Sequence, residues 1–264
     1  MELGLNGKVA IVTGGSEGIG KAAALSLASE GAKVAIAARR QDALDAAVEE
    51  IKQSSGNQGV MGLSTDVTDQ QQVQRLIDIV VGTWGGLDIL VNNAGTSNAH
   101  VFDQVPDEIW NYDVNLKVFG AIYCSRAAIP HMKQRGGGRI VNITTPGGKA
   151  AAGGSLPTSM SRAAGIALTK AMSKDYAADN ILVNTVCIGL IKSGQHERRW
   201  QAAHEKNPSL TLEQWYQQMG ERVPLGRVGE AREAGDLICW LASERASYVT
   251  GTAINVDGGT SAVV

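Results

Sequence analysis

The chain has 264 residues, 44% of them apolar, and a formal net charge of −2. That length can bury a large core without disulfides or structural metals. The near-neutral charge gives no sign of a nucleic-acid partner or of an anionic membrane surface as partner. No apolar run approaches the ~18 residues of a membrane span, and the N-terminus lacks the pattern of a signal peptide. We therefore expect a small-molecule partner, with no nucleic acid and no membrane.

Cysteine and histidine usage gives no metal signature. Cys124, Cys187 and Cys239 lie far apart, and the four histidines are scattered. Reduced thiols of this kind are typical of a cytoplasmic protein. The sequence therefore predicts a cytoplasmic location and no metal site.

Short β-branched runs alternate with longer stretches of helical period along the chain. The runs are apolar on both faces, which is typical of a parallel sheet covered on each side. The expected strands are Val9–Thr13, Val34–Ala38, Val60–Ser64, Ile89–Asn92, Ile140–Ile143, Ile181–Val186 and Ala253–Val256. The expected helices are Gly20–Ser29, Gln41–Ser54, Gln70–Trp84, Asp107–Gln134, Ser159–Tyr176 and Ala231–Leu241. This alternation predicts an α/β fold with a doubly wound sheet. No linker or repeat interrupts it, so a single domain over 1–264 is expected.

One polar stretch, about 192–223, breaks this rhythm before the last strand. It carries Trp200 and Trp215 and is predicted to form two short helices. We interpret it as a helical substrate lid; a plain structural insertion is the alternative.

A glycine-rich turn follows the first strand. It reads Thr13-Gly14-Gly15-Ser16-Glu17-Gly18-Ile19-Gly20 and leads into a helix. Glycines here let the backbone approach a pyrophosphate, and the helix N-terminus offers free N–H groups. A turn of this kind within a βαβ unit predicts a dinucleotide site. The residues expected to hold the cofactor are Gly14, Ser16, Glu17, Gly18, Ile19 and Gly20.

The end of the second strand bears on the choice between NAD and NADP. An acidic residue there would bind the ribose 2′-hydroxyl of NAD, whereas this chain has Ala38 followed by Arg39. A guanidinium suits a 2′-phosphate, so NADP is favoured, with NAD as the alternative. Two solvated arginines opening a helix would give the same pattern, and the acidic Glu17 argues mildly against NADP.

Further motifs continue to the end of the chain. They are Asp66-Val67, Asn92-Asn93-Ala94-Gly95, Asp113-Val114-Asn115, Arg139-Ile140-Val141-Asn142-Ile143, Val183-Asn184, Tyr248-Val249-Thr250-Gly251 and Val256-Asp257-Gly258-Gly259. Together with the glycine turn, they resemble the classical short-chain dehydrogenase/reductase family over essentially the whole chain.

The resemblance implies a seven-stranded Rossmann fold that assembles as a homo-oligomer, a tetramer or a dimer. It also implies further cofactor contacts. Asp66 and Val67 would face the adenine. The floor under the cofactor would consist of Asn92, Ala94 and Gly95. Near the nicotinamide amide would lie Gly189, Ile191 and Ser193, after an Ile188 that replaces the usual proline.

The family's catalytic residues are asparagine, serine, tyrosine and lysine, and this chain departs from them. Asn115 matches the asparagine, but the serine position reads Thr145, the tyrosine position Thr158 and the lysine position Arg162. Thr145 keeps a hydroxyl, and Arg162 keeps a charge that can bind the cofactor ribose. Thr158 is the severe change, because an aliphatic hydroxyl cannot be ionised near neutral pH as a phenol of pKa ~10 can be. Other protonatable groups expected nearby are Lys149, Lys192, His196 and His204.

Three functions stay open at this point. The first is an NADP-dependent oxidoreductase acting on a carbonyl or secondary alcohol with an atypical proton relay. The second is a cofactor-binding pseudo-dehydrogenase that serves as a sensor or subunit, because the glycine turn is kept while the acid is lost. The third is a non-redox lyase or dehalogenase-like enzyme, for which Arg162 is the one hint.

Overall fold

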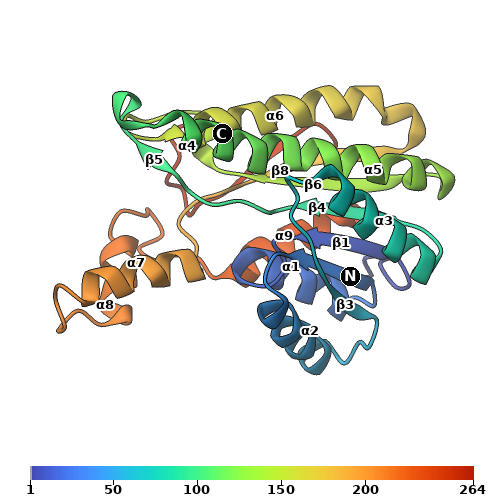
Figure 1. The fold of residues 1–264 in the computed structure, drawn as a ribbon, viewed down its shortest axis with the longest axis horizontal. Coiled ribbons are helices and arrows are strands. Elements are labelled where there is room, and N and C mark those ends of the chain that lie inside the picture. Colours follow the sequence, from blue (N-terminus) through green and yellow to red (C-terminus); the bar gives the residue numbers. More distant parts are fainter. Residues whose placement is uncertain (1) are drawn as a thin grey trace.

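Seven parallel strands form the central sheet of the computed structural model, which describes residues 2–264 (Figure 1). They are β1 (Val9–Thr13), β2 (Lys33–Ala38), β3 (Val60–Ser64), β4 (Ile89–Asn92), β6 (Gly138–Thr144), β8 (Ile181–Ile188) and β9 (Ala253–Val256). Their order is β3-β2-β1-β4-β6-β8-β9, with every neighbouring pair parallel. The predicted doubly wound, seven-stranded sheet is confirmed. Its winding reverses between β1 and β4, where open α/β sheets bind ligands.

Helices cover both faces of this sheet (Figure 1). One apolar cluster joins the sheet to α1 (Gly18–Ser29), α2 (Gln41–Ser55) and α9 (Ala231–Ala242). A second cluster on the other face joins it to α3 (Gln70–Trp84), α5 (Gly120–Gln134) and α6 (Thr158–Asp175). Because strands such as β1 and β4 are buried throughout, the sheet is a rigid support for the loops at its carboxyl ends.

Helix ends follow local capping chemistry. At the start of α3, the Asp69 carboxylate accepts hydrogen bonds from the backbone N–H groups of Gln71 and Gln72. The helix ends at Gly85, whose φ of +81° is a conformation that glycine adopts without strain. These signals explain why the predicted and observed bounds of this helix agree.

The predicted helix Asp107–Gln134 is interrupted in the structure. It consists of α4 (Asp107–Val114), a π-helical turn at Asn115–Phe119, and α5. A π turn accommodates an extra residue in the helix and rotates the side chains that follow. Here it leaves Asn115 exposed and buries Lys117, which is only 7% exposed.

Two further elements border the sheet's carboxyl edge. The antiparallel strands β5 (Ala99–His100) and β7 (Leu156–Pro157) form a small second sheet that the sequence pattern did not predict. Helices α7 (Gly194–His204) and α8 (Leu212–Gly220) occupy the polar stretch 192–223 and extend away from the main body (Figure 1). The role of these helices as a lid stays a prediction. None of the helices formed by residues 2–264 is long and apolar enough to cross a membrane.

Candidate active site

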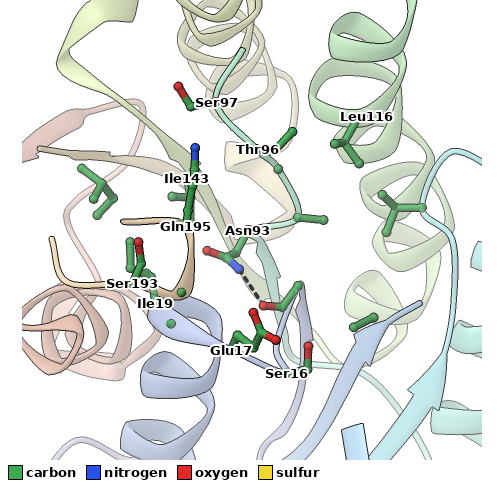
Figure 2. Close-up of a pocket in the computed structure, with 18 of the residues that line it drawn as sticks. Ser16, Glu17, Ile19, Asn93, Thr96, Ser97, Leu116, Ile143, Ser193 and Gln195 are labelled. Carbon is green, nitrogen blue, oxygen red and sulfur yellow. Dashed lines mark hydrogen bonds between the residues drawn. The ribbon is translucent and has the colours of Figure 1, made fainter. Parts of the chain in front are cut away.

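A cleft of about 660 Å³ opens at the carboxyl ends of β1, β4, β6 and β8. Figure 2 shows Ser16 and Glu17 at one end, Asn93 in the middle, and Thr96 and Ser97 toward the other end. Ser193 and Gln195, from the start of the predicted lid, close one side (Figure 2). The cleft therefore lies at the switch point of the sheet and extends from the glycine turn to the lid.

The glycine turn is shaped to keep its backbone bare. Gly14 and Gly18 have φ values of +63° and +55°. A Cβ on Gly20 would overlap the carbonyl oxygen of Gly14, and one on Gly14 would lie 2.9 Å from the Asn93 side-chain nitrogen. A turn with no room for side chains, at the N-terminus of α1, fits the pyrophosphate of a nicotinamide dinucleotide.

Hydrogen bonds hold this turn against Asn93 and Ala94, which directly follow β4. The Thr13 hydroxyl accepts from the backbone N–H groups of Asn93 and Ala94, at 3.0 and 3.1 Å. The Asn93 amide donates to the carbonyls of Thr13 and Gly14, both at 3.0 Å. These bonds fix β1 and β4 in one geometry under the cofactor cleft.

One end of the cleft, beside the glycine turn and β2, is called the ribose end here. It is lined by Arg39, Arg40 and Arg198 and by the carboxylates of Glu17 and Asp66. Glu17 pairs with Arg40 and, at 3.5 Å, with Arg198 from α7. Arg39 is exposed, and within residues 2–264 its guanidinium makes no hydrogen bond or ion pair. Glu17 is therefore already neutralised by two arginines, and Arg39 remains available for an anion.

Most of the residues predicted from the sequence do line the cleft. They are Gly14, Ser16, Glu17, Gly18, Ile19, Arg39, Asp66, Val67, Ala94, Gly95, Thr145, Arg162, Gly189, Ile191 and Ser193. Gly20 is buried beneath the turn. Asn92 lies below the floor, where its amide donates to Ser125 and Asn142 at 3.1 and 2.9 Å. Gly20 and Asn92 therefore support the wall of the cleft without lining it.

Arg162 lies between the cleft and the core. One of its terminal nitrogens donates to the carbonyl of Ile143 at 2.6 Å, and the other lies beside Gly95. Burial lowers the pKa of Arg162 to about 10, while Asp113 acts in the opposite direction. Arg162 is thus charged at neutral pH and forms part of the cleft wall.

Thr158 and Asn115 are not brought to the cleft. The Thr158 side chain is buried and hydrogen-bonded to the backbone of Asn98, the residue before β5. Asn115, the first residue of the π turn, is exposed to solvent. The side chain of this turn that reaches Thr158 is instead that of Lys117, at 3.0 Å.

Sequence reasoning missed this buried charged cluster. The Lys117 ammonium pairs with Asp113, whose carboxylate also accepts from Ser161 at 2.6 Å and from Asn98 at 3.1 Å. The one signal in the sequence was a pair of opposite charges four residues apart, a spacing that is equally common on solvent-exposed helix faces. Burial, and secondarily Arg162, lower the pKa of Lys117 to about 8, although the bond to Asp113 opposes the shift.

Of the other protonatable candidates, only His196 lines the cleft. Burial and the nearby Arg199 lower its pKa. Lys149 donates to Ala253 and Asn255 of β9, at 2.6 and 2.7 Å, and so has a structural role. Across residues 2–264 no group of three or more His, Cys, Asp or Glu side chains is placed to hold a metal.

Known protein families and sequences match this chain over nearly its whole length. The family model described as enoyl-(acyl carrier protein) reductase matches residues 14–261. The 3-oxoacyl-(acyl-carrier-protein) reductase FabG of Thermotoga maritima is 34% identical over 255 residues, which are 97% of this chain and 98% of that one.

Solved structures agree. The L-sorbose reductase of Gluconobacter frateurii, complexed with NADPH and L-sorbose, matches with a TM-score of 0.95 and 31% identity, over 100% of both chains. A short chain oxidoreductase of Pseudomonas aeruginosa, described as containing an atypical catalytic center, matches with a TM-score of 0.93 and 35% identity, over 99% of this chain and 100% of that one. With its glycine turn, its sheet order and these full-length matches, the chain belongs to the short-chain dehydrogenase/reductase family of oxidoreductases.

Proposed function

We propose that this protein is an NADPH-preferring oxidoreductase that interconverts a carbonyl compound and a secondary alcohol through an atypical proton relay. The observation that carries the proposal is the bare glycine turn opening into a cleft whose ribose end holds Arg39, a side chain without a partner within residues 2–264. A free guanidinium at this place favours the 2′-phosphate of NADP(H). NADPH also occupies the related sorbose reductase and a short chain oxidoreductase of P. aeruginosa with an atypical center.

The chain's own residues would divide the work. When bound, NADPH supplies a hydride to the substrate carbon. Gly14, Gly18 and the N-terminus of α1 would bind the pyrophosphate, and Arg162 the nicotinamide ribose. Thr145, whose side chain lines the cleft, would donate a hydrogen bond to the substrate oxygen. These groups bind and orient, but none of them is an acid that titrates near neutral pH.

The substrate end of the cleft favours a polar carbonyl compound. Thr96, Ser97, Gln195 and His196 all line it, and they supply hydroxyl, amide and imidazole groups. A site built to hydrogen-bond hydroxyl groups discriminates strongly against analogues that lack them. We therefore expect hydroxylated ketones and the corresponding polyols to be better substrates than plain aliphatic ketones of equal length.

The test has two stages. Titration with NADPH and NADH, followed by nicotinamide fluorescence, should show binding with a preference for NADPH. A panel of ketoses, polyols and plain ketones should then show turnover at the absorbance band of the reduced nicotinamide, greatest for the hydroxylated compounds. Binding of neither cofactor would refute the proposal.

A second candidate, a cofactor-binding protein without redox turnover, is favoured by one observation. The Thr158 hydroxyl is committed to Asn98 and Lys117, so it cannot replace the missing phenol directly. NADPH binding without turnover of any compound on the panel would support this candidate.

We further propose that the protein assembles as a homo-oligomer, a dimer or a tetramer. Large apolar side chains remain exposed around α4–α5 and on α6, among them Tyr112, Phe119 and Met160. Burial of such faces against a second copy is the ordinary way in which unpartnered apolar helices are covered. Light scattering after size-exclusion chromatography should give a mass that is a multiple of 27.7 kDa.

A further inference from the structure

The hydroxyl of Thr158 has no hydrogen-bonding capacity left for a substrate. It donates to the carbonyl of Asn98 at 2.7 Å and accepts from the backbone N–H of Asn98 at 2.9 Å. Its second lone pair accepts from the Lys117 ammonium at 3.0 Å. A hydroxyl has one donor and two acceptor sites, and all three are used. A proton for the substrate oxygen must therefore come from another group.

Lys117 is the protonated group next to that position. Its side chain is 1% exposed, and it enters from the π turn between α4 and α5. Two of its three N–H donors are taken by Asp113 and Thr158. One N–H therefore remains for a further partner.

A small cavity supplies the place for that partner. It measures about 20 Å³ and is lined by Lys117, Arg162, Ala94, Leu116 and Thr144, among others. The last four of these residues also line the main cleft, so the cavity lies directly behind the cleft wall. A volume above ~10–15 Å³ with polar partners can hold one water molecule.

Two buried polar atoms at this cavity have no partner within residues 2–264. They are the side-chain oxygen of Asn92 and the Nε of Arg162. Such atoms are almost always hydrogen-bonded, often to an internal water. A water molecule in the cavity would have Asn92 as acceptor and Arg162 and Lys117 as donors.

We propose that Lys117 is the proton donor of this site and that it acts on the substrate oxygen through a water molecule held in the small cavity. This inference rests on the proposed oxidoreductase function. In the direction of reduction, a hydride adds to the carbonyl carbon and the π electron pair moves to oxygen. The oxygen takes a proton from the water, the water takes one from the Lys117 ammonium, and the neutral amine regains its proton from solvent. Reduced cofactor, carbonyl compound and one proton thus give oxidised cofactor and alcohol.

The charges around Lys117 suit this role. Asp113 on α4 favours the ammonium, whereas Arg162 on α6 and burial disfavour it, which together set its pKa to about 8. The residues that face the cluster from β4 and β6, Asn92 and Asn142, are uncharged. The ammonium therefore predominates at pH 7 and can release its proton, as a general acid that works near neutral pH must.

The test compares Lys117→Met with a matched control, Lys174→Met, at an exposed lysine on α6. Loss of a positioned proton donor should lower kcat by about 10²–10⁴-fold. The Kd for NADPH, measured by fluorescence, should stay within about threefold, because cofactor contacts are untouched. The reduction rate of the wild type should fall above pH 8, where Lys117 loses its proton, and this fall should be absent from the variant.

A second variant guards against misfolding. Lys117→Met leaves the buried Asp113 carboxylate without its cation, which is destabilising. The double variant Asp113→Asn/Lys117→Met removes both charges of the pair. It should show the same loss of kcat. In Lys117→Ala, added methylamine should restore part of the rate. If either variant that carries Lys117→Met keeps kcat within threefold and still loses activity above pH 8, Lys117 is not the proton donor. The proposed oxidoreductase function would stand in that case. Wild-type protein that turns over no carbonyl compound would overturn the proposed function, and this role with it.

Discussion

At the scale of single residues, Arg39 is the side chain that we expect to set cofactor preference. It lines the ribose end of the cleft without a partner in the described chain, while Arg40 is held by Glu17. A charged hydrogen bond to a phosphate contributes about 1.5–3 kcal/mol. Arg39→Ala should therefore weaken NADPH binding by about 10–100-fold and leave the Kd for NADH within about threefold. Fluorescence titration measures both, with the exposed Arg75→Ala as control. Equal losses for the two cofactors would contradict this assignment.

The Asp113 carboxylate should control the pH profile of the same site. It raises the pKa of Lys117 against the effects of burial and Arg162. Asp113→Asn removes a negative charge beside the ammonium, so the pKa of Lys117 should fall below its wild-type value of about 8. Since reduction needs the ammonium, the alkaline fall in kcat should move to lower pH. A profile that stays in place or moves to higher pH would show that Lys117 does not govern this limb.

Most of the residues that line the cleft were predictable from the sequence, but the buried Lys117 was not. Gly14 and Gly18 have positive φ values, a conformation that glycine adopts readily. A glycine at these positions therefore indicates the backbone conformation of the turn directly from the sequence. Lys117 gives no such signal, because its burial depends on a π turn that shifts the face of the helix after Val114. The same shift explains why Asn115, which matches the family motif in sequence, is exposed.

At the scale of elements, the strands and most helices follow from hydrophobic period and capping residues. Two features do not. The small sheet of β5 and β7 has only two residues in each strand, too few for an alternating pattern to appear. The apolar residues on both sides of the π turn keep a helical spacing. A search for a period of 3.6 residues therefore predicts one continuous helix across the turn.

An ionic contact links the predicted lid to the glycine turn. Arg198 of α7 lies 3.5 Å from the Glu17 carboxylate, which also holds Arg40. Glu17→Gln removes a negative charge beside the place of a 2′-phosphate and releases both arginines. Because these groups are largely exposed, the expected gain in NADPH affinity is modest, about 2–5-fold, and should shrink at high salt.

The matched control is Glu50→Gln, since Glu50 of α2 also pairs with a cation, Lys21 of α1, and neither residue lines the cleft. It should leave NADPH affinity unchanged. Weaker binding by Glu17→Gln would mean that Glu17 contributes to cofactor binding directly rather than competing for the arginines.

At the scale of the whole molecule, the buried Lys117 links folding stability to pH. In the unfolded chain its pKa returns to the ordinary 10.5, whereas in the folded protein it is about 8. Between these two values the unfolded state binds more protons, so the free energy of unfolding rises with pH through this group. Below about pH 8 the lysine is protonated in both states and the full penalty of burying the charge applies.

Comparison with the neutral variant Asp113→Asn/Lys117→Met isolates this ion pair, because the two proteins share every titrating group except Asp113 and Lys117. Between pH 7.5 and 9.5, the stability of the wild type relative to the variant should increase by about 2 kcal/mol, as expected for a lysine pKa lowered over this range. Urea denaturation of both proteins at the two pH values measures the difference. The sign is the decisive outcome: a stability difference that is flat or falls with pH would mean that Lys117 keeps an ordinary or raised pKa in the folded protein. A lysine of that kind would hold its proton too tightly to supply it to a substrate near neutral pH.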